Sequence, residues 1–412
     1  MAPGASAGRD GHKIRLLEGS REFFPALITA MNQAHAEIRL ETYIFDFTGG
    51  GAQVAEALVR AAKRGVITWV VVDGVGTGPL PADWQDRFSA AGVQWRIYSP
   101  LGRLGLLIPS RWRRLHRKLC VVDGRLAFCG GINILDDFHD PQHGPLGHPR
   151  LDFAVRASGA LVAQAHAATG QLWWRIQAVR NVRQRHFPQA LSTLREAGLN
   201  LPWNPDDAGL GSDDRRVAHA GLLLRDNLLN RSKIERAYRK AIAGARDEII
   251  IANAYFLPGR KLRKALMHAA QRGVRVRLLL QGKYEYFMQF HAARPVYGAL
   301  MAAGVEIHEY TASFLHAKVA VIDAGAEHPW ATVGSSNLDP LSLLLAREAN
   351  VMVEDAAFAQ DLRQRLADAI AHSGRVMDAA QFAARPWYRR ALEGVALGVM
   401  RALLLVQGKK YL

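Results

Sequence analysis

Two stretches of this sequence place a histidine, a lysine and an aspartate at the same spacing. They contain His116, Lys118 and Asp123 in the first stretch and His316, Lys318 and Asp323 in the second. Apolar residues surround each His-x-Lys pair, which is typical of a strand, and the two-residue period of a strand puts the histidine and the lysine on one face. An imidazole beside an ammonium suits a phosphodiester, because the lysine can neutralise a non-bridging oxygen as a point charge.

Together the two motifs supply the groups that a phosphodiester transfer needs. One histidine can attack phosphorus as a covalent nucleophile. The other can protonate the leaving alcohol and then deprotonate the incoming one. One motif supplies only half of this machinery, so the mechanism requires both. A single copy is common on surface strands, whereas two copies at the same place in a repeat are specific.

A Gly-x-x-Asn segment follows each motif on the next strand-like run, after a turn. The candidate support residues are Gly130 and Asn133 in the first copy and Gly334, Ser336 and Asn337 in the second. The glycine allows the backbone to approach a phosphate closely, and the asparagine can donate to a phosphate oxygen. The second copy has four extra residues between its motif aspartate and its glycine, which predicts a longer hairpin turn there.

A carboxylate lies further along each copy, Asp152 in the first and Glu348 in the second. A carboxylate on the far ring nitrogen would orient a catalytic histidine and stabilise its cation. A lone acidic residue in a strand-like run is more often a surface group, so these two residues are secondary candidates.

The elements that must position these residues also occur twice and in the same order. Strand-like runs at Ile38–Phe45 and Trp69–Gly74 match runs at Ile249–Phe256 and Val276–Gly282, and a helix-like run separates the members of each pair. Strands that alternate with helical patterns predict α/β units on a largely parallel sheet. Two such copies predict two α/β repeats related by a pseudo-twofold axis, with the active site at their interface.

The chain has 412 residues, which suits two domains. We expect the first repeat at residues 13–187 and the second at residues 216–375. Residues 188–215 between them are rich in Pro, Gly and Asp, which indicates a linker. Residues 376–412 form an amphipathic C-terminal tail.

The duplicated motif resembles that of the phospholipase D superfamily, so we expect two phospholipase D-like repeats. Three segments are similar to bacterial cardiolipin synthases of the shorter B type. They are Leu115–Lys118, Ile250–Phe256 and Trp330–Leu343. The similarity covers roughly residues 12 to 375, which is nearly all of both repeats.

This resemblance implies a phosphatidyltransferase that converts two phosphatidylglycerol molecules into cardiolipin and glycerol. It also implies a phosphohistidine intermediate, with no metal and no other cofactor. By the same resemblance, His116 would be the nucleophile and His316 the acid and base, although the residues themselves leave this order open. Asp123 and Asp323 would be structural members of the motif.

The formal net charge of +16 indicates anionic partners, which could be nucleic acid, an anionic membrane or phosphate-bearing substrates. With the resemblance, we expect phosphatidylglycerol and other anionic phospholipids at a membrane surface, no nucleic acid and no obligate protein partner. Neither a signal peptide nor a run of about 18 apolar residues is visible. The expected location is therefore peripheral, on the cytoplasmic side of a bacterial inner membrane.

Two segments could contact that membrane. One is the loop Leu101–Arg114, which combines apolar residues, a tryptophan and arginines. The other is the tail from Trp387, whose apolar run is interrupted by Glu393 and Arg401, so that an interfacial helix is expected rather than a spanning one. The alternatives are a partly buried loop and a C-terminal helix docked on the core.

Two other activities would use the same motifs. A hydrolytic phospholipase D would discharge the phosphohistidine with water and release phosphatidic acid. A phosphodiesterase that acts on nucleic acid would also suit the positive charge. Residue chemistry does not separate transfer from hydrolysis, because the difference lies in water exclusion and in a pocket for the acceptor alcohol.

Overall fold

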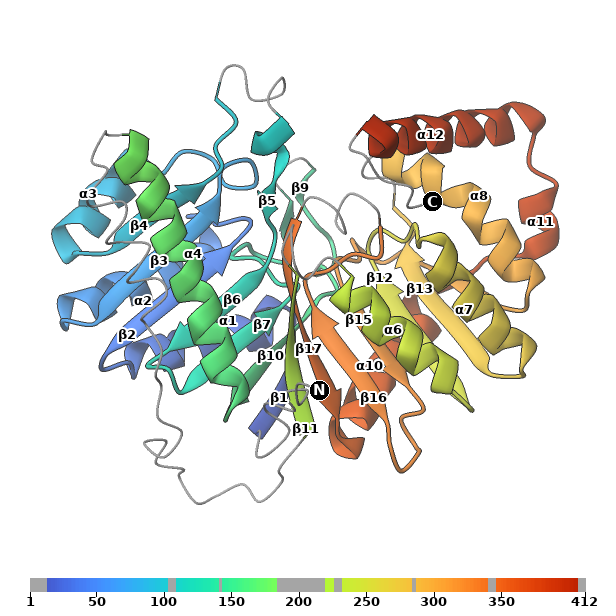
Figure 1. Ribbon diagram of the computed structural model, residues 1–412, viewed down its shortest axis with the longest axis horizontal. Helices are drawn as coiled ribbons and strands as arrows, with labels where there is room; N and C mark the ends of the chain where they lie inside the picture. Colours follow the sequence, from blue (N-terminus) through green and yellow to red (C-terminus); the bar gives the residue numbers. More distant parts are fainter. Residues whose placement is uncertain are drawn as a thin grey trace, which may run out of the picture. The chain divides into compact units, whose positions relative to one another are not determined.

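The computed structural model describes residues 13–102, 109–140, 143–183, 219–225, 232–283, 287–339 and 346–406 (Figure 1). The chain forms two compact units. Unit 1 comprises the residues up to Asp136 and Ala154–Leu222, and unit 2 comprises Asp137–Phe153 and the residues from Leu223 onwards. The predicted linker, residues 188–215, lies outside the described residues.

Unit 1 is built on a mixed sheet with the strand order β1-β10-β7-β6-β2-β3-β4. These strands are β1 (Lys13–Glu18), β2 (Glu37–Thr42), β3 (Ile67–Asp73), β4 (Gln94–Tyr98), β6 (Lys118–Val122), β7 (Leu126–Gly130) and β10 (Phe153–Ser158). The helices are α1 (Gly19–Asn32), α2 (Gly49–Lys63), α3 (Ala82–Ala91) and α4 (Leu161–Arg183). A 3-10 turn, η2 (Pro109–Trp112), and a short strand, β5 (Arg114–Leu115), precede the first motif.

Helices cover both faces of this sheet, because its inner strands are apolar on both faces. On one face, Val70 and Val72 of β3 pack into a core formed with α1, α2 and α3. On the other face, Trp69 and Val71 pack with Trp173 of α4, and the rings of Trp69 and Trp173 stack with centroids 4.9 Å apart. Full burial of one large apolar side chain contributes about 2 kcal/mol to the free energy of folding. The strands around the first motif are therefore held from both sides.

Unit 2 repeats the plan, with the strand order β11-β17-β16-β15-β12-β13-β14-β18. These strands are β11 (His219–Arg225), β12 (Glu248–Asn253), β13 (Arg275–Gln281), β14 (Glu306–Tyr310), β15 (Lys318–Ile322), β16 (Trp330–Gly334), β17 (Ala346–Glu354) and β18 (Gly374–Val376). The helices are α6 (Lys233–Gly244), α7 (Arg260–Gln271), α8 (Phe287–Ala302), α10 (Ala356–Ser373), α11 (Ala379–Ala383) and α12 (Trp387–Val406). The segment contributed from residues 137–153 forms a small ladder of β8 (His139–Asp140) and β9 (Gly144–Pro145).

The core of unit 2 lies between its sheet and helices α6, α7, α8 and α12. Ile249 and Ile251 of β12 share one buried cluster with residues of all four helices. Helix α10 contacts β12, β14, β15, β16 and β17. Within the described residues, no helix is both long and apolar enough to cross a bilayer.

Both sheets are mixed, whereas the sequence predicts largely parallel ones. In unit 1, β2, β3 and β4 are parallel, but the motif strand β6 runs antiparallel to both β2 and β7. Unit 2 has the same arrangement around β15. For β6 with β7 and β15 with β16 the physical reason is the connection, because a short turn between two strands can only join antiparallel neighbours. The longer turn predicted in the second copy is confirmed, since β15 ends at Ile322 and β16 begins at Trp330.

Candidate active site

The first motif lies in unit 1 at the start of β6. The Nζ atom of Lys118 donates to the backbone oxygen of His116 over 2.8 Å. The ring of Tyr43 lies beside both, with centroids 5.0 Å from the His116 ring and 5.5 Å from the ammonium of Lys118. His116 is half-buried and Lys118 is 4% exposed. The imidazole and the ammonium therefore share one small region, as the two-residue period predicts.

The residue between them points the other way. Arg117 is 4% exposed and forms an ion pair with Glu41 of β2. Its guanidinium also donates to the backbone oxygen of Ala168 in α4 over 2.9 Å. A buried charge is stable only when it is paired and hydrogen-bonded, and Arg117 is both. This contact fixes the rotation of the segment that carries His116 and Lys118.

The motif aspartates occupy equivalent places in the two units. Asp123 accepts hydrogen bonds from the backbone N–H groups of three consecutive residues, at 3.0, 2.8 and 2.9 Å. Asp323 accepts three in the same way, at 2.8, 2.9 and 2.9 Å. Both residues have a left-handed backbone, with φ of 52° and 48°, which aspartate tolerates better than most residues. Each carboxylate thus ties the turn after its motif strand to the segment that leads into β2 or β12.

The second motif lies in unit 2 at the start of β15. The ammonium of Lys318 donates to the backbone oxygen of His316. The Nδ1 atom of His316 lies 2.6 Å from a carboxylate oxygen of Asp152, which is 2% exposed. The other oxygen of Asp152 accepts from the N–H of Phe153 over 2.8 Å. A carboxylate held in this way fixes the imidazole through Nδ1 and leaves Nε2 for proton transfer.

Asp152 lies within the first sequence repeat, but it contacts the histidine of the second. The structure explains this, because Asp137–Phe153 belongs to unit 2. Leu151 donates to the backbone oxygen of Phe314 over 3.0 Å and accepts from the N–H of His316 over 2.9 Å. No local signal in the sequence shows which histidine Asp152 would contact.

Glu348 has a different environment from Asp152. It is fully buried and accepts a hydrogen bond from the hydroxyl of Ser335. That hydroxyl also accepts from the N–H of Ala349 over 3.1 Å. In the described part of unit 2, Glu348 therefore holds the turn after β16, while Asp152 contacts the histidine.

The Gly-x-x-Asn turns are packed against the rest of their units. The side-chain oxygen of Asn133 accepts from the N–H of Ile44 over 3.1 Å, and Gly130 pairs with Lys118 across β6 and β7. Ser336 and Asn337 are buried, and the N–H of Ser336 lies 3.3 Å from the side-chain oxygen of Asn350.

The second glycine has a packing role that the sequence does not reveal. A Cβ atom at Gly334 would lie 2.2 Å from the Cγ atom of Asn350 and 2.6 Å from the backbone oxygen of Ala349. Glycine is therefore required at this position to let β17 pack against β16. The motif suggests another reason for the glycine, namely close approach of the backbone to a phosphate.

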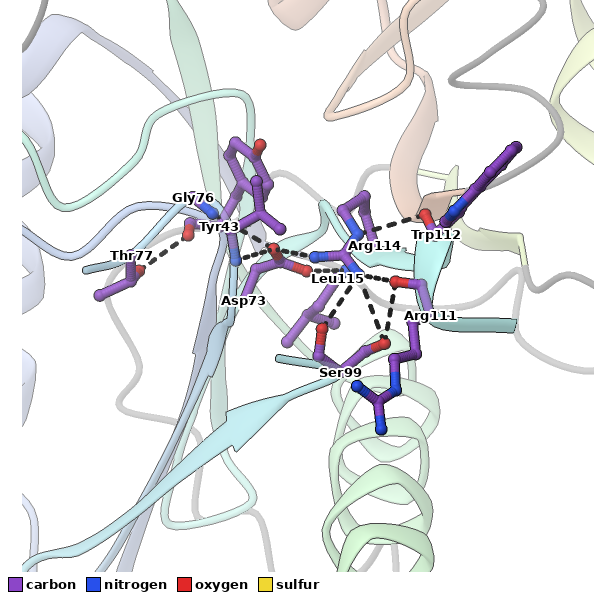
Figure 2. A network of polar contacts seen from close by, with 10 residues as sticks. Tyr43, Asp73, Gly76, Thr77, Ser99, Arg111, Trp112, Arg114 and Leu115 are labelled. Atoms are coloured by element: carbon purple, nitrogen blue, oxygen red, sulfur yellow. Dashed lines mark hydrogen bonds and ion pairs between the residues drawn. The ribbon is translucent and has the colours of Figure 1, made fainter. Parts of the chain in front are cut away.

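A polar network that the sequence does not single out holds the strand before His116 (Figure 2). Asp73, at the end of β3, is fully buried and accepts from the N–H of Leu115 over 2.7 Å. Its other oxygen pairs with Arg114 over 3.0 Å. Arg114 also donates to the backbone oxygen of Ser99 over 3.0 Å. Burial raises the pKa of Asp73, against the opposing charge of Arg114.

Unit 2 has a neutral counterpart of this network. Gln281 ends β13 as Asp73 ends β3, and its side-chain oxygen accepts from the N–H of Leu315 over 2.9 Å. In each unit the residue directly before the motif histidine is thus anchored to the end of a neighbouring strand. The signal available in the sequence is positional, since each acceptor stands directly before a glycine in the matching strand of its repeat.

The predicted membrane loop Leu101–Arg114 is only partly described, since residues 103–108 lie outside the described ranges. Two of its arginines have contacts within unit 1. Arg111 donates to the backbone oxygen of Leu101 over 2.8 Å, and Arg114 belongs to the network around Asp73. In the described residues, no group of three or more His, Cys, Asp or Glu side chains is placed to hold a metal ion.

Comparison with known proteins agrees with this geometry. The family described as "Cardiolipin synthase, PLD-like domain" matches residues 27–139 and 238–370, which include both motifs. A relative named cardiolipin synthase B from Escherichia coli (strain K12) is 37% identical over 402 residues, covering 95% of this chain and 89% of the relative. The chain belongs to the phospholipase D superfamily, in the family of the type B cardiolipin synthases.

More distant relatives of this cardiolipin synthase family have lower sequence identity to the chain. A cardiolipin synthase A from Cronobacter sakazakii is 28% identical, over 94% of this chain and 75% of the relative. The crystal structure of a phosphatidylserine synthase from Haemophilus influenzae has a TM-score of 0.64 at 12% identity, covering 97% of this chain and 95% of that one. At that identity the likeness concerns the fold, which is a mixed α/β fold with two phospholipase D-like repeats.

Proposed function

We propose that this protein is a cardiolipin synthase that transfers a phosphatidyl group from one phosphatidylglycerol to another and releases glycerol. The contact between His316 and Asp152 is the observation that carries the proposal. It gives one motif histidine the fixed ring and the stabilised cation that an acid and base needs. The identity of 37% to a cardiolipin synthase B over 95% of the chain supports the choice of substrate.

In the first half of the reaction, the imidazole of His116 attacks phosphorus of the donor phosphatidylglycerol. The bond from phosphorus to the glycerol oxygen breaks, and Nε2 of His316 gives its proton to that oxygen. The products are a phosphatidyl-histidine and free glycerol. Lys118 and Lys318 balance the charge of the non-bridging oxygens. Asp152 holds the His316 ring that remains after proton transfer in the tautomer with the proton on Nδ1, so that Nε2 can later accept a proton.

In the second half, a terminal hydroxyl of another phosphatidylglycerol gives its proton to Nε2 of His316. The oxygen attacks phosphorus, the bond from phosphorus to His116 breaks, and cardiolipin leaves. Both steps need the two histidines at one phosphorus atom, and one chain with two intact motifs supplies both. The support residues Gly130, Asn133, Gly334, Ser336, Asn337 and Glu348 shape the turns beside the motifs in this proposal.

The direct test is to incubate the purified protein with phosphatidylglycerol vesicles and to analyse the lipids by mass spectrometry. We expect cardiolipin and glycerol in equal amounts, and no product from His116→Ala or His316→Ala. Phosphatidic acid as the sole product would replace the proposal with a hydrolytic phospholipase D. Full activity in both variants would refute the assignment of the site.

The order of the histidines needs a separate experiment with a phosphatidyl ester of p-nitrophenol, whose leaving group needs no proton. We expect His316→Ala to release one burst of p-nitrophenol and to accumulate the phosphatidyl-histidine. His116→Ala should release none. The opposite pattern would exchange the two roles.

The proposed location is peripheral, at the cytoplasmic side of a bacterial inner membrane, with anionic phospholipids as partners. The net charge of +16 supports attraction to an anionic surface. We expect most of the protein to sediment with inner-membrane vesicles at low salt and to be released by carbonate. Retention after the carbonate wash would contradict peripheral binding.

A further inference from the structure

Helix α12 has two apolar faces, one buried and one exposed. Its inner face consists of Glu393, Ala396, Leu397 and Met400, which are buried at helical spacing. The last three belong to the core cluster of unit 2 that also contains residues of α8. Figure 1 shows α12 (red) lying along α8. This inner face accounts for the docking of the helix.

The outer face is also apolar, and no contact in the described part of unit 2 covers it. Trp387, Tyr388, Leu392, Val395 and Val399 are 79%, 56%, 40%, 63% and 45% exposed. The last four follow each other at intervals of three or four residues, so they form one stripe. They and Trp387 are five of the eleven large hydrophobic side chains that are exposed in the described chain. Such a concentration on one helix indicates a binding surface rather than scattered exposure.

The outer face is free of negative charge from Trp387 to Arg401. The one acidic residue of this stretch is Glu393, which is 6% exposed and points inward. It pairs with Arg385 over 2.5 Å. The remaining charged residues of the stretch are Arg389, Arg390 and Arg401, and all three are exposed. Sequence alone suggests that Glu393 interrupts the apolar run, but the structure removes it from the surface.

The N-terminal end of α12 carries more positive than negative charge. Burial lowers the pKa of Arg385, and the charges of nearby arginines lower it further, against the opposing effect of Glu393. These arginines are Arg294, Arg389 and Arg390. Arg294 also pairs with Glu309 over 2.7 Å, so the exposed positive charge at this end comes from Arg389 and Arg390.

A second group of positive charges lies toward the C-terminal end of α12. Burial lowers the pKa of Arg263 on α7, and the charges of Arg401 and Arg260 lower it further. Lys261 and Lys264 of the same helix are exposed. An apolar stripe between two basic clusters matches a surface with an apolar interior and anionic headgroups.

We propose that the outer face of α12 lies in the headgroup region of an anionic phospholipid bilayer, with Tyr388, Leu392, Val395 and Val399 toward the acyl chains. The arginines at both ends reach the phosphates, as long basic side chains do at interfaces. Trp387 lies at the boundary, where an aromatic ring with a polar tip is favoured. This proposal deepens the proposed function, because it names the surface from which the lipid substrate would come.

The test measures binding of the full chain to phosphatidylglycerol/phosphatidylcholine vesicles by co-sedimentation, without turnover. We expect Val395→Glu/Val399→Glu to weaken binding at least tenfold. Val179→Glu is the matched control, because Val179 is 55% exposed on helix α4 of unit 1, and it should change binding less than twofold. Arg389→Gln/Arg390→Gln should weaken binding to anionic vesicles and leave the weak binding to pure phosphatidylcholine unchanged.

Insertion is read directly by a fluorophore sensitive to polarity on Val395→Cys. Addition of anionic vesicles should shift its emission to the blue, and the same label on Val179→Cys should not shift. The native cysteines, Cys120 and Cys129, are buried and should stay unlabelled in the folded protein.

Unchanged vesicle binding in Val395→Glu/Val399→Glu would overturn the proposal. If the same variant also lost a dimer in sedimentation velocity, the stripe would be assigned to a second copy of the chain. Failure of the proposed function is separate, because it would leave vesicle binding intact while no cardiolipin forms. Conversely, the double variant should still act on short-chain phosphatidylglycerol dispersed below its micelle concentration.

Discussion

Replacement of Asp152 by asparagine tests the contact that distinguishes the second motif. The amide keeps the shape of the side chain and can still accept from the N–H of Phe153, which the carboxylate does over 2.8 Å. It loses the charge that faces Nδ1 of His316 at 2.6 Å. A hydrogen bond to a charged group contributes about 1.5–3 kcal/mol, which corresponds to roughly a 10- to 150-fold loss of kcat. An asparagine NH2 group that donates to Nδ1 would also select the wrong tautomer, and in a comparable triad that costs about 10⁴.

The assay compares cardiolipin formation with release of p-nitrophenol from the activated ester. Asp152→Asn should lower the rate of cardiolipin formation at least tenfold. It should slow the burst of p-nitrophenol clearly less, because the burst needs no acid. Asp140→Asn is a suitable control, since Asp140 is a buried carboxylate of the same segment that pairs with Arg150. Equal losses in both variants, or equal losses with both substrates, would refute a role of Asp152 in orienting the acid and base.

Three further substitutions test the supports of the site. Asp73→Asn should lower kcat about tenfold with KM nearly unchanged, because it weakens the anchor of the strand before His116; steady-state kinetics checks this. Asp123→Ala removes the acceptor of three backbone N–H groups and should lower the free energy of unfolding in urea by about 1–3 kcal/mol. Gly334→Ala should cost about 1–3 kcal/mol or more by overpacking, whereas Gly325→Ala, whose Cβ would meet its nearest neighbour at 3.8 Å, should be tolerated in the same experiment.

The sequence predicts the parts of the fold that depend on local patterns. Alternation of apolar residues defines the motif strands, and the repeated order of elements predicts two α/β units. The same patterns do not reveal strand direction, so the antiparallel pairing of β6 and β15 differs from the largely parallel sheets expected. Direction is decided by how short each connection is and by which strands it joins, and these depend on the exact ends of the strands.

Contacts over long sequence distances are the part that could not be predicted. Asp152 and His316 are 164 residues apart, and their pairing follows from the return of Asp137–Phe153 to unit 2. Glu393 is a similar case, because its orientation depends on how α12 rotates against α8. The buried face of a helix with two apolar faces cannot be read from its periodicity.

The course of the chain through Asp137–Phe153 has a consequence for the two repeats as modules. A cut in the segment 188–215 would separate two sequence repeats of similar length, yet the C-terminal fragment would contain His316 without Asp152. The N-terminal fragment would in turn contain Asp152 without its histidine, so the pair depends on a chain that keeps both sequence repeats.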